Sequence, residues 1–171
     1  MSRGDMSRDD MSDAPLTHVD DHGRARMVDV TGKAVTQRRA LARCIVRTTD
    51  TAAKSLLADE DAVAFARAAG MLGANRAPEL VPLCHPLPLD EVSIRVHVGQ
   101  GSIEILAETA VVARTGVEIE ALTACGITAL NLVMVLLPHD PTARVDTLAL
   151  WEKSGGRSGT WRRGEVPASE G

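Results

Sequence analysis

Segment 121–137 constrains the fold more than any other part of this chain, because it contains no Asp, Glu, Lys, Arg or His. Apolar residues on nearly every side of a helix are typical of burial in a protein core. Polar residues, among them Thr128 and Asn131, interrupt the segment before it reaches the roughly 18 apolar residues of a membrane span. We therefore expect a buried core helix over Val117–Leu137 that ends at Pro138.

The other elements predict a sheet on which this helix can pack. Residues 92–98 alternate between apolar and polar side chains, and the alternation resumes at 103–105 after two glycines, which indicates a hairpin. The remaining predicted elements are a strand over Arg39–Thr48, helices over Thr51–Leu57 and Glu60–Asn75, and a last strand over Val145–Leu150. This order is that of the split βαβ motif, so we predict an α+β, ferredoxin-like fold with the helices on one face of an antiparallel sheet.

Charge and aromatic content exclude two classes of protein. The chain has 19 basic and 23 acidic residues among 171, so its overall field does not attract nucleic acid or anionic lipid. It contains Phe65, Trp151, Trp161 and no tyrosine, too few aromatic side chains for a platform that stacks single-stranded bases. We predict neither a nucleic-acid partner nor a membrane partner.

Acidic residues concentrate near the termini. We predict disordered tails over 1–14 and 165–171 and a single domain over 15–164, within which acidic and basic residues are equal in number. Local charge clusters therefore matter more than the total. Three scattered cysteines suit a reducing compartment, and the N-terminus lacks the apolar region of a signal peptide, so we expect a cytoplasmic location.

One charge cluster follows Trp151. Between Trp151 and Arg163, four basic residues accompany one acidic residue, in a segment rich in glycine and serine. Such a backbone approaches an anion closely and offers N–H groups, while Lys and Arg side chains such as Lys153 supply charge. The segment is a candidate anion site, and a solvated basic surface is the alternative interpretation.

A proline-rich loop presents the first candidate side chains. Three prolines keep Val81–Pro88 extended. Histidine exchanges protons near neutral pH, and a rigid loop lowers the entropy cost of contacting a ligand, so His85 is a candidate functional group. Its alternative role is to cap a backbone carbonyl. Adjacent residues such as Cys84 and His85 rarely bind one ion together, and we predict no metal site and no bound cofactor.

Two carboxylates begin the long helix. Glu118 and Glu120 follow Thr115–Val117, and acidic residues at a helix N-terminus are stabilised by the helix dipole without any functional role. In a helix, side chains two residues apart point to different sides, whereas in an extended segment they share one face. We expect the two carboxylates to form one acid–base or ribose-binding site only if the segment is extended.

Polar residues near the N-terminus have simpler interpretations. Asp29 lies in an apolar stretch, where it would cap or support the backbone. His18 and His22 flank Asp20 and Asp21, a group that can bind a metal ion, but we favour a solvated surface.

Five segments carry a resemblance to a known family. PLCHPL (82–87) and TGVEIEALTA (115–124) are the most unusual, and LTHVD (16–20), MVDV (27–30) and EKSGGRSG (152–159) accompany them in this order. Together they resemble the cyclic pyranopterin monophosphate synthases of molybdenum cofactor biosynthesis. The resemblance extends from Leu16 to Arg163.

This resemblance implies a ferredoxin-like subunit in a homohexamer, a trimer of dimers with sites between subunits. Members convert a cyclised dihydroguanosine triphosphate, made by a partner radical enzyme, into cyclic pyranopterin monophosphate and diphosphate. That chemistry needs positioned acids and bases, and cations for the triphosphate. Lys153 matches a catalytic lysine that binds phosphate or transfers a proton. The matching motifs imply that the substrate-binding residues are Leu83, Cys84, His85, Glu118, Ile119 and Glu120.

Several positions depart from the family pattern. On the long helix, Met134 and Leu137 stand where family members have a catalytic aspartate and a catalytic lysine. Asp59 stands near the place of a third catalytic group, a loop lysine, and Lys54 is the nearest base. The lysine before PLCHPL is replaced by Asn75–Arg76. Loss of one positioned acid or base typically lowers a rate by about 10²–10⁴-fold.

The matches and the departures leave three hypotheses. The retained substrate-contact residues favour an active synthase with altered acid–base groups. Met134 and Leu137 favour a catalytically impaired paralogue that binds the ligand or assembles with an active copy. A different reaction on another purine nucleotide is the third, because folds and motifs survive changes of chemistry.

Overall fold

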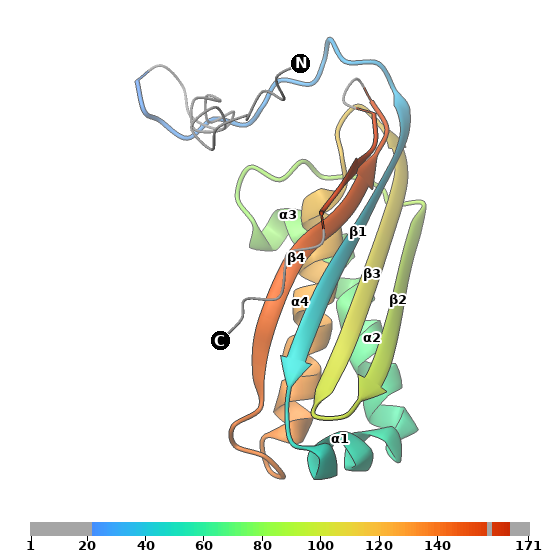
Figure 1. Ribbon diagram of the computed structural model, residues 1–171. Coiled ribbons are helices and arrows are strands. Elements are labelled where there is room, and N and C mark those ends of the chain that lie inside the picture. Colours follow the sequence, from blue (N-terminus) through green and yellow to red (C-terminus); the bar gives the residue numbers. More distant parts are fainter. Residues whose placement is uncertain (1–21, 157–158, 165–171) are drawn as a thin grey trace, which may run out of the picture.

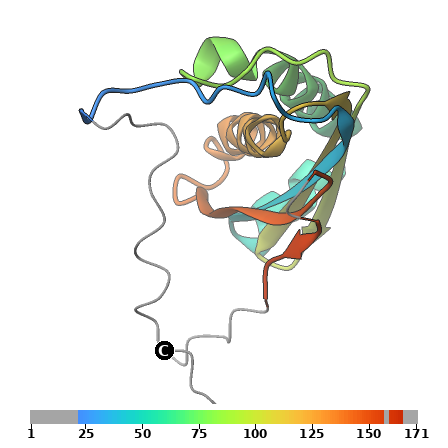
Figure 2. The same cartoon turned by 90° about the horizontal axis from the view of Figure 1, so that it is seen from above.

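The computed structural model describes residues 22–156 and 159–164. The predicted tails, the LTHVD segment, and His18, Asp20 and Asp21 of the N-terminal polar group lie outside these residues. The described chain forms one five-stranded antiparallel sheet in the order β2-β3-β1-β4-β5, with the helices packed on one face (Figures 1 and 2). Its elements are β1 (Thr36–Arg47), α1 (Asp50–Leu57), α2 (Glu60–Asn75), α3 (Ala77–Leu80), β2 (Glu91–Gly99), β3 (Ser102–Ala113), α4 (Glu118–Leu136), β4 (Arg144–Ser154) and β5 (Trp161–Arg162).

The predicted α+β, ferredoxin-like class is confirmed, and the element boundaries differ in places. The first strand begins at Thr36 instead of Arg39, and the last long strand continues to Ser154 instead of ending at Leu150. The sequence analysis missed α3 and β5. α3 is a single turn with a proline near its start, and β5 pairs through two residues only. Elements this short leave no periodic pattern to detect.

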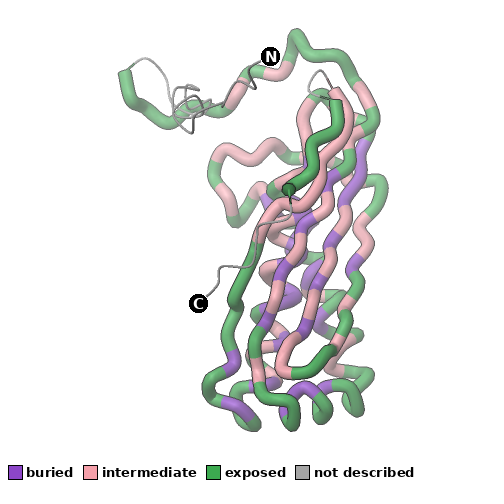
Figure 3. Tube along the Cα trace, in the orientation of Figure 1, coloured by how far each residue is buried: buried purple, intermediate pink, exposed green. Residues whose placement is uncertain are grey.

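Alternate residues of the central strands form the sheet side of the core. On β1 the buried positions are Ala40, Ala42, Cys44 and Val46. Ile105 of β3 pairs with Cys44 and is itself fully buried. The small side chains of β1 allow α4 to lie close over this strand, and buried positions follow β1, β3 and α4 in Figure 3.

α4 is the predicted core helix. By length and composition it could cross a membrane, but here it packs against the sheet (Figure 2). Ala121, Cys125, Leu132 and Leu136 on its sheet-facing side are almost completely buried. The helix therefore forms the centre of a two-layer domain, as its composition predicted.

α4 also connects opposite ends of the molecule. It begins at the end that carries α3 and the N-terminal segment, and it finishes beside α1 (Figure 1). At about 1.5 Å rise per residue, Met134 lies about 21 Å along the helix axis from Glu120. Met134 and Leu137 therefore lie at the end of the molecule opposite to Glu118 and Glu120.

Asp59 has a structural role at the α1 end. Its Oδ1 accepts a hydrogen bond of 2.9 Å from the Ala62 N–H and caps the N-terminus of α2. A lysine at this position has no oxygen acceptor to offer. Asp59, near the place of the family's loop lysine, is therefore the N-cap of α2.

Candidate active site

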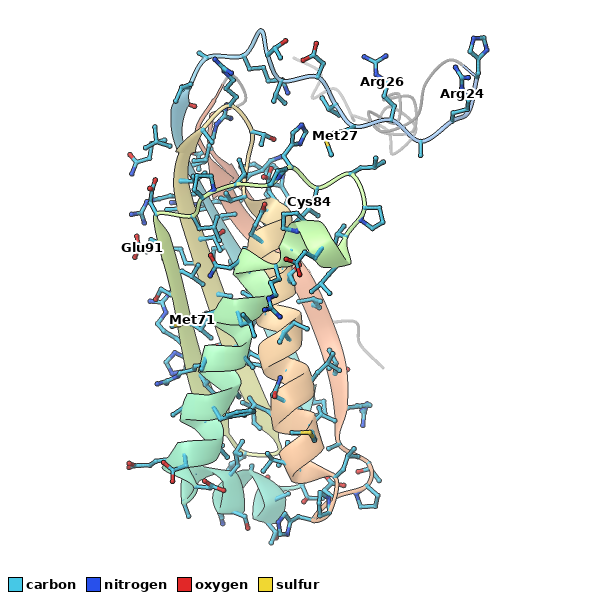
Figure 4. All side chains as sticks on the ribbon, turned by 180° about the vertical axis from the view of Figure 1, so that it is seen from behind. Arg24, Arg26, Met27, Met71, Cys84 and Glu91 are labelled. Atoms are coloured by element: carbon cyan, nitrogen blue, oxygen red, sulfur yellow. The ribbon has the colours of Figure 1, made fainter. Side chains whose placement is uncertain are left out.

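A cleft of about 1130 Å³ opens at the end of the molecule where α4 begins. Its walls come from the segment before β1 with the start of β1, from the proline-rich loop, from the start of α4 and from the end of β4. Figure 4 shows Cys84 at this end, below the N-terminal segment that carries Met27. Every site residue that the sequence predicts lines this cleft: Leu83, Cys84, His85, Glu118, Ile119, Glu120 and Lys153.

A tight turn sets the direction of the proline-rich loop. The Cys84 N–H donates a 3.2 Å hydrogen bond to the Val81 carbonyl, with Pro82 and Leu83 between them. Leu83 has φ = 69°, the one positive φ at a non-glycine position within 22–156 and 159–164. Proline followed by a residue of positive φ is the arrangement of a type II turn. Beyond this turn, both Cys84 and His85 line the cleft.

His85 contacts a backbone carbonyl, the alternative role that the sequence left open, and also faces the cleft. Its Nε2 lies 2.9 Å from the Val28 carbonyl oxygen, which joins the proline-rich loop to the N-terminal segment. The side chain also lines the cleft. Next to Val28, Asp29 supports the backbone as predicted, because its Oδ1 accepts hydrogen bonds from the Thr31 N–H at 2.9 Å and the Thr31 hydroxyl at 2.8 Å. These bonds lower the pKa of Asp29.

Glu118 and Lys153 form an ion pair inside the cleft. Glu118 Oε1 lies 3.2 Å from Lys153 Nζ, and the two side chains are 29% and 40% exposed. Glycine at position 116 leaves room for the Glu118 side chain, because a Cβ at residue 116 would overlap the Glu118 carboxylate. Ion pairs this exposed contribute little to stability, so this pair matters mainly for where it holds the lysine.

Glu120 lies deeper and contacts the proline-rich loop. Only 3% of the residue is exposed, and Cys84 Sγ donates a 3.4 Å hydrogen bond to its Oε1. Burial raises the pKa of Glu120, although hydrogen bonds from its own N–H and from Cys84 oppose the shift. Burial and the neighbouring Glu120 carboxyl raise the pKa of Cys84 to about 12, so this thiol keeps its proton at neutral pH.

The expectation that only an extended segment would bring both carboxylates into one site is wrong. α4 begins at Glu118, so Glu118 and Glu120 both belong to its first turn. They point in different directions, one toward Lys153 and one toward Cys84. Both nevertheless line the cleft, because the cleft covers the end of the helix rather than one of its sides.

Two polar groups on β1 join the site and were missed in the sequence. Arg38 Nη2 donates a 3.3 Å hydrogen bond to the Arg114 carbonyl. Arg38 Nε and Thr36 Oγ1 are buried with no hydrogen-bond partner in the described part of the chain. Buried polar groups are almost always paired, so this pair indicates the place of a polar ligand. Strand alternation could have identified them. If the predicted strand had begun at Thr36 instead of Arg39, both side chains would have fallen on the same side as the buried Ala40 and Ala42.

The two glycines that follow β4 lie directly against Gln37 and Arg38 of β1. A Cβ at Gly156 would overlap the Arg38 guanidinium, and φ at Gly156 is +69°. A Cβ at Gly155, where φ is +100°, would overlap the Gln37 carbonyl. The paired glycines of the EKSGGRSG segment are therefore needed for a close approach of two strands beside the cleft.

Most of the positive charge of the cleft comes from outside the basic C-terminal segment. Lys33, Arg38 and Arg114 line the cleft with Lys153. Arg162, by contrast, pairs with Glu152 at 2.8 Å, and Arg163 Nε donates to the Leu150 carbonyl at 2.8 Å. For these two arginines the contacts favour the alternative interpretation, a basic surface, because both support the β4–β5 hairpin. Arg157 lies outside the described residues.

The positions that depart from the family pattern do not line this cleft. Asp59, Met134 and Leu137 lie at the α1 end, and Asn75–Arg76 closes α2 without contributing to the cleft wall. Within one chain, Met134 and Leu137 are therefore too far away to contact a ligand in this cleft.

The arrangement suits a ligand with an anionic part and an apolar ring. Four cations line the cleft, and Leu83, Leu87 and Ile119 provide an apolar surface beside them. Two carboxyl groups in unlike surroundings, one ion-paired and one buried, provide for proton transfer. Within the described ranges no group of three or more His, Cys, Asp or Glu side chains could hold a metal ion.

Comparison with known proteins identifies the family. The model of the MoaC family matches residues 27–156, a range that contains the whole cleft lining. The cyclic pyranopterin monophosphate synthase of Thermomicrobium roseum is 47% identical over 156 residues, which cover 88% of this chain and 94% of that protein. Its namesake in Streptomyces avermitilis is 44% identical over 152 residues, 86% of this chain and 89% of the relative.

A third relative comes from an organism in which the synthases are numbered, with a synthase 2 and a synthase 3. Cyclic pyranopterin monophosphate synthase 3 of Mycobacterium tuberculosis is 45% identical over 166 residues, 93% of this chain and 94% of the relative. These matches confirm the resemblance drawn from the PLCHPL and TGVEIEALTA segments. This chain belongs to the MoaC family.

Proposed function

We propose that this chain is a cyclic pyranopterin monophosphate synthase, a lyase of molybdenum cofactor biosynthesis. It converts a cyclised dihydroguanosine triphosphate into cyclic pyranopterin monophosphate and diphosphate. The observation that carries the proposal is the composition of one cleft in a MoaC-family chain: the Glu118–Lys153 ion pair, the buried Glu120 and three further cations share its walls.

The cations bind the triphosphate. Lys33 and Arg114 form no ion pair with the rest of the described chain, so their charge is available to an anion. Arg38 Nε and Thr36 Oγ1 provide hydrogen-bond donors that have no partner among the residues described. These groups also stabilise the diphosphate that leaves, because fixed cations act most strongly where negative charge develops.

The two carboxyl groups divide the proton transfers. Glu118, paired with Lys153 at the edge of the cleft, acts as the base that removes protons from the substrate. Glu120, whose pKa is raised by burial beside the Cys84 thiol, is the group that donates a proton to the opening ring. His85, fixed by the Val28 carbonyl, contacts the substrate beside Glu120.

The decisive experiment is turnover by the purified full-length chain. Cyclised dihydroguanosine triphosphate is incubated with the protein, and the pterin product and diphosphate are quantified. We expect product well above the uncatalysed background, about 10²–10⁴-fold less with Lys153→Ala, and partial recovery with Lys153→Arg. No product above background at high protein concentration would refute the proposed function.

A catalytically impaired paralogue is the second candidate. Its supporting observation is that the α1 end offers exposed Met134 and Leu137, at 58% and 46% exposure, where the family has an acid and a base. If sites form between subunits, this end would face the cleft of another copy. The candidate predicts binding of the precursor without turnover, and turnover after Met134→Asp combined with Leu137→Lys.

We also propose that the chain assembles as a homohexamer, a trimer of dimers, in the cytoplasm. An apolar surface, the α4–β4 face, supports assembly. It consists of exposed residues of α4 and the neighbouring part of β4: Leu130, Met134, Leu137, Val145 and Leu148. Contiguous exposed apolar residues of this kind mark contact surfaces between proteins.

A further inference from the structure

Leu83 occupies a backbone conformation that is unfavourable for a leucine. Its φ of 69° lies in the left-handed region, where the Cβ crowds the following carbonyl oxygen. Position three of a type II turn usually holds glycine or asparagine, which accept this conformation without strain. The Val81–Cys84 turn carries a branched aliphatic side chain there instead.

The hydrophobic core does not explain this choice. Leu87 and Leu89 of the same loop pack against the buried core, whereas Leu83 does not belong to that cluster. The Leu83 side chain is only partly buried, and it lines the cleft. A strained residue persists where the surrounding structure or a function requires it, and Leu83 supplies part of a cleft wall.

The other walls define what that surface meets. Ile119, 38% exposed, and Leu87 are further large aliphatic side chains that line the same cleft as Leu83. Lys33, Arg38 and Arg114 provide charge for phosphates. The cleft therefore has an aliphatic part for a flat ring and a cationic part for a triphosphate.

We propose that Leu83 is a specificity-determining residue, held by its left-handed backbone against the ring system of a nucleotide-derived triphosphate. Leu83 thereby distinguishes a ring-bearing triphosphate from the bare anion, at the expense of fold stability. The inference rests on the proposed function for the class of ligand, but it concerns binding and stability rather than turnover.

The test compares two probes and three variants of the full chain. GTP carries a ring, and inorganic tripolyphosphate does not. Leu83→Gly removes both the side chain and the strain, Leu83→Ala removes the side chain and keeps the strain, and Leu83→Asn relieves the strain with a polar group. We expect all three to bind GTP about 10-fold more weakly and tripolyphosphate within about twofold of the unmodified chain.

Thermal unfolding supplies a readout that a purely structural role would not produce. We expect Leu83→Gly and Leu83→Asn to raise Tm while they weaken GTP binding, and Leu83→Ala not to raise Tm. Val81→Gly is the matched control. It lies in the same turn, outside the cleft lining, and should lower Tm without changing the ratio of the two affinities.

Three results would overturn the inference: a lower Tm for Leu83→Gly, an equal loss of affinity for both probes, or no GTP binding by the unmodified chain. The proposed function fails separately. If the unmodified chain binds GTP through Leu83 but does not turn over the cyclised precursor, the synthase assignment is wrong and the role of Leu83 stands.

Discussion

At the residue scale, Glu120 shows how a functional carboxyl reduces stability. The ordinary pKa of 4.5 is raised in the folded chain, chiefly because the carboxyl is buried. The folded state therefore holds this proton more tightly than the unfolded chain does. The resulting stabilisation is complete below the unfolded pKa and is lost as pH rises through the folded pKa. At neutral pH, Glu120 therefore lowers the free energy of unfolding.

Glu120→Gln should therefore be more stable than the unmodified chain, with a Tm difference that grows as pH is raised from about 4 to 8. The same variant should lose activity by about 10²–10⁴-fold, because glutamine cannot exchange the proton. Thermal unfolding across pH and the turnover assay measure the two effects. Glu104→Gln, which breaks the pair with Arg43 on the sheet face away from the helices, is the control and should leave activity unchanged. A Tm difference that shrinks with rising pH contradicts the assignment.

At the element scale, the position of α4 depends on close packing against α2. A Cβ at Gly70 would overlap Thr128 Oγ1 and come within 2.8 Å of the Ala124 carbonyl oxygen. Thr128 is fully buried and donates its hydroxyl to that same carbonyl at 2.8 Å. Because the start of α4 carries both site carboxylates, this contact also maintains the cleft.

Gly70→Ala should destabilise the fold by about 1–3 kcal/mol through overpacking. Helix propensity alone predicts the opposite sign, since alanine favours a helix over glycine by up to about 1 kcal/mol. Denaturant unfolding measures the change. Ala68→Gly, at an exposed position of the same helix, is the matched control, with an expected loss of about 0.5–1 kcal/mol. A stabilised Gly70→Ala variant would show that the helices can separate at no cost.

Asp140 links the junction between β1 and α1 to the turn between α4 and β4. Its carboxylate accepts hydrogen bonds from the Thr48 hydroxyl and the Thr49 N–H, both at 2.8 Å. It also accepts from the Thr142 N–H at 2.9 Å and the Thr142 hydroxyl at 2.6 Å. The hydrogen bonds from Thr142 and Thr48 lower the pKa of Asp140 to about 2. The contacts connect the end of β1 to the turn between α4 and β4.

Asp140→Asn should lower Tm at neutral pH, because an amide cannot accept all of these bonds. A lowered pKa contributes stability above the unfolded value of 3.8, and that stability is lost as pH falls toward about 2. The Tm difference should therefore narrow over this interval. Asp146→Asn, which removes the exposed pair with Arg47, serves as the control, and an equal effect of both substitutions would argue against the junction role.

At the scale of the whole molecule, the two ends of the domain have different compositions. The cleft end carries the cations and carboxylates, whereas the α1 end carries the apolar α4–β4 face. Single exposed apolar residues are ordinary on protein surfaces, but a contiguous group on one helix and the adjacent strand is not. This asymmetry supports an assembly in which the α4–β4 face is covered.

We expect light scattering on the purified chain to give a mass that is a multiple of the 18.1 kDa subunit. Met134→Lys should shift the mass toward the single subunit, because burying an unpaired charge in an interface is unfavourable. Met71→Lys on α2, exposed at 39% and labelled in Figure 4, is the matched control and should leave the mass unchanged. A single-subunit mass for the unmodified chain would contradict the proposed assembly.

Local patterns in the sequence were sufficient for the elements and for the residues held in short motifs. Strand alternation and the uncharged segment predicted the sheet and α4, because burial of one face leaves a period that can be read from neighbouring residues. Leu83–His85 and Glu118–Glu120 were found through the PLCHPL and TGVEIEALTA motifs, since each group lies in one continuous segment.

The tertiary structure decided what lies beside these motifs. Thr36, Arg38 and Arg114 enter the cleft through the register of β1 with β3 and the close approach of the glycines that follow β4, and no local pattern specifies pairings between distant segments. The sequence alone determined the family, the long helices and strands, and the separation of Met134 and Leu137 from Glu120 along one helix. The cationic wall was decided only by the tertiary structure, because it depends on non-local packing.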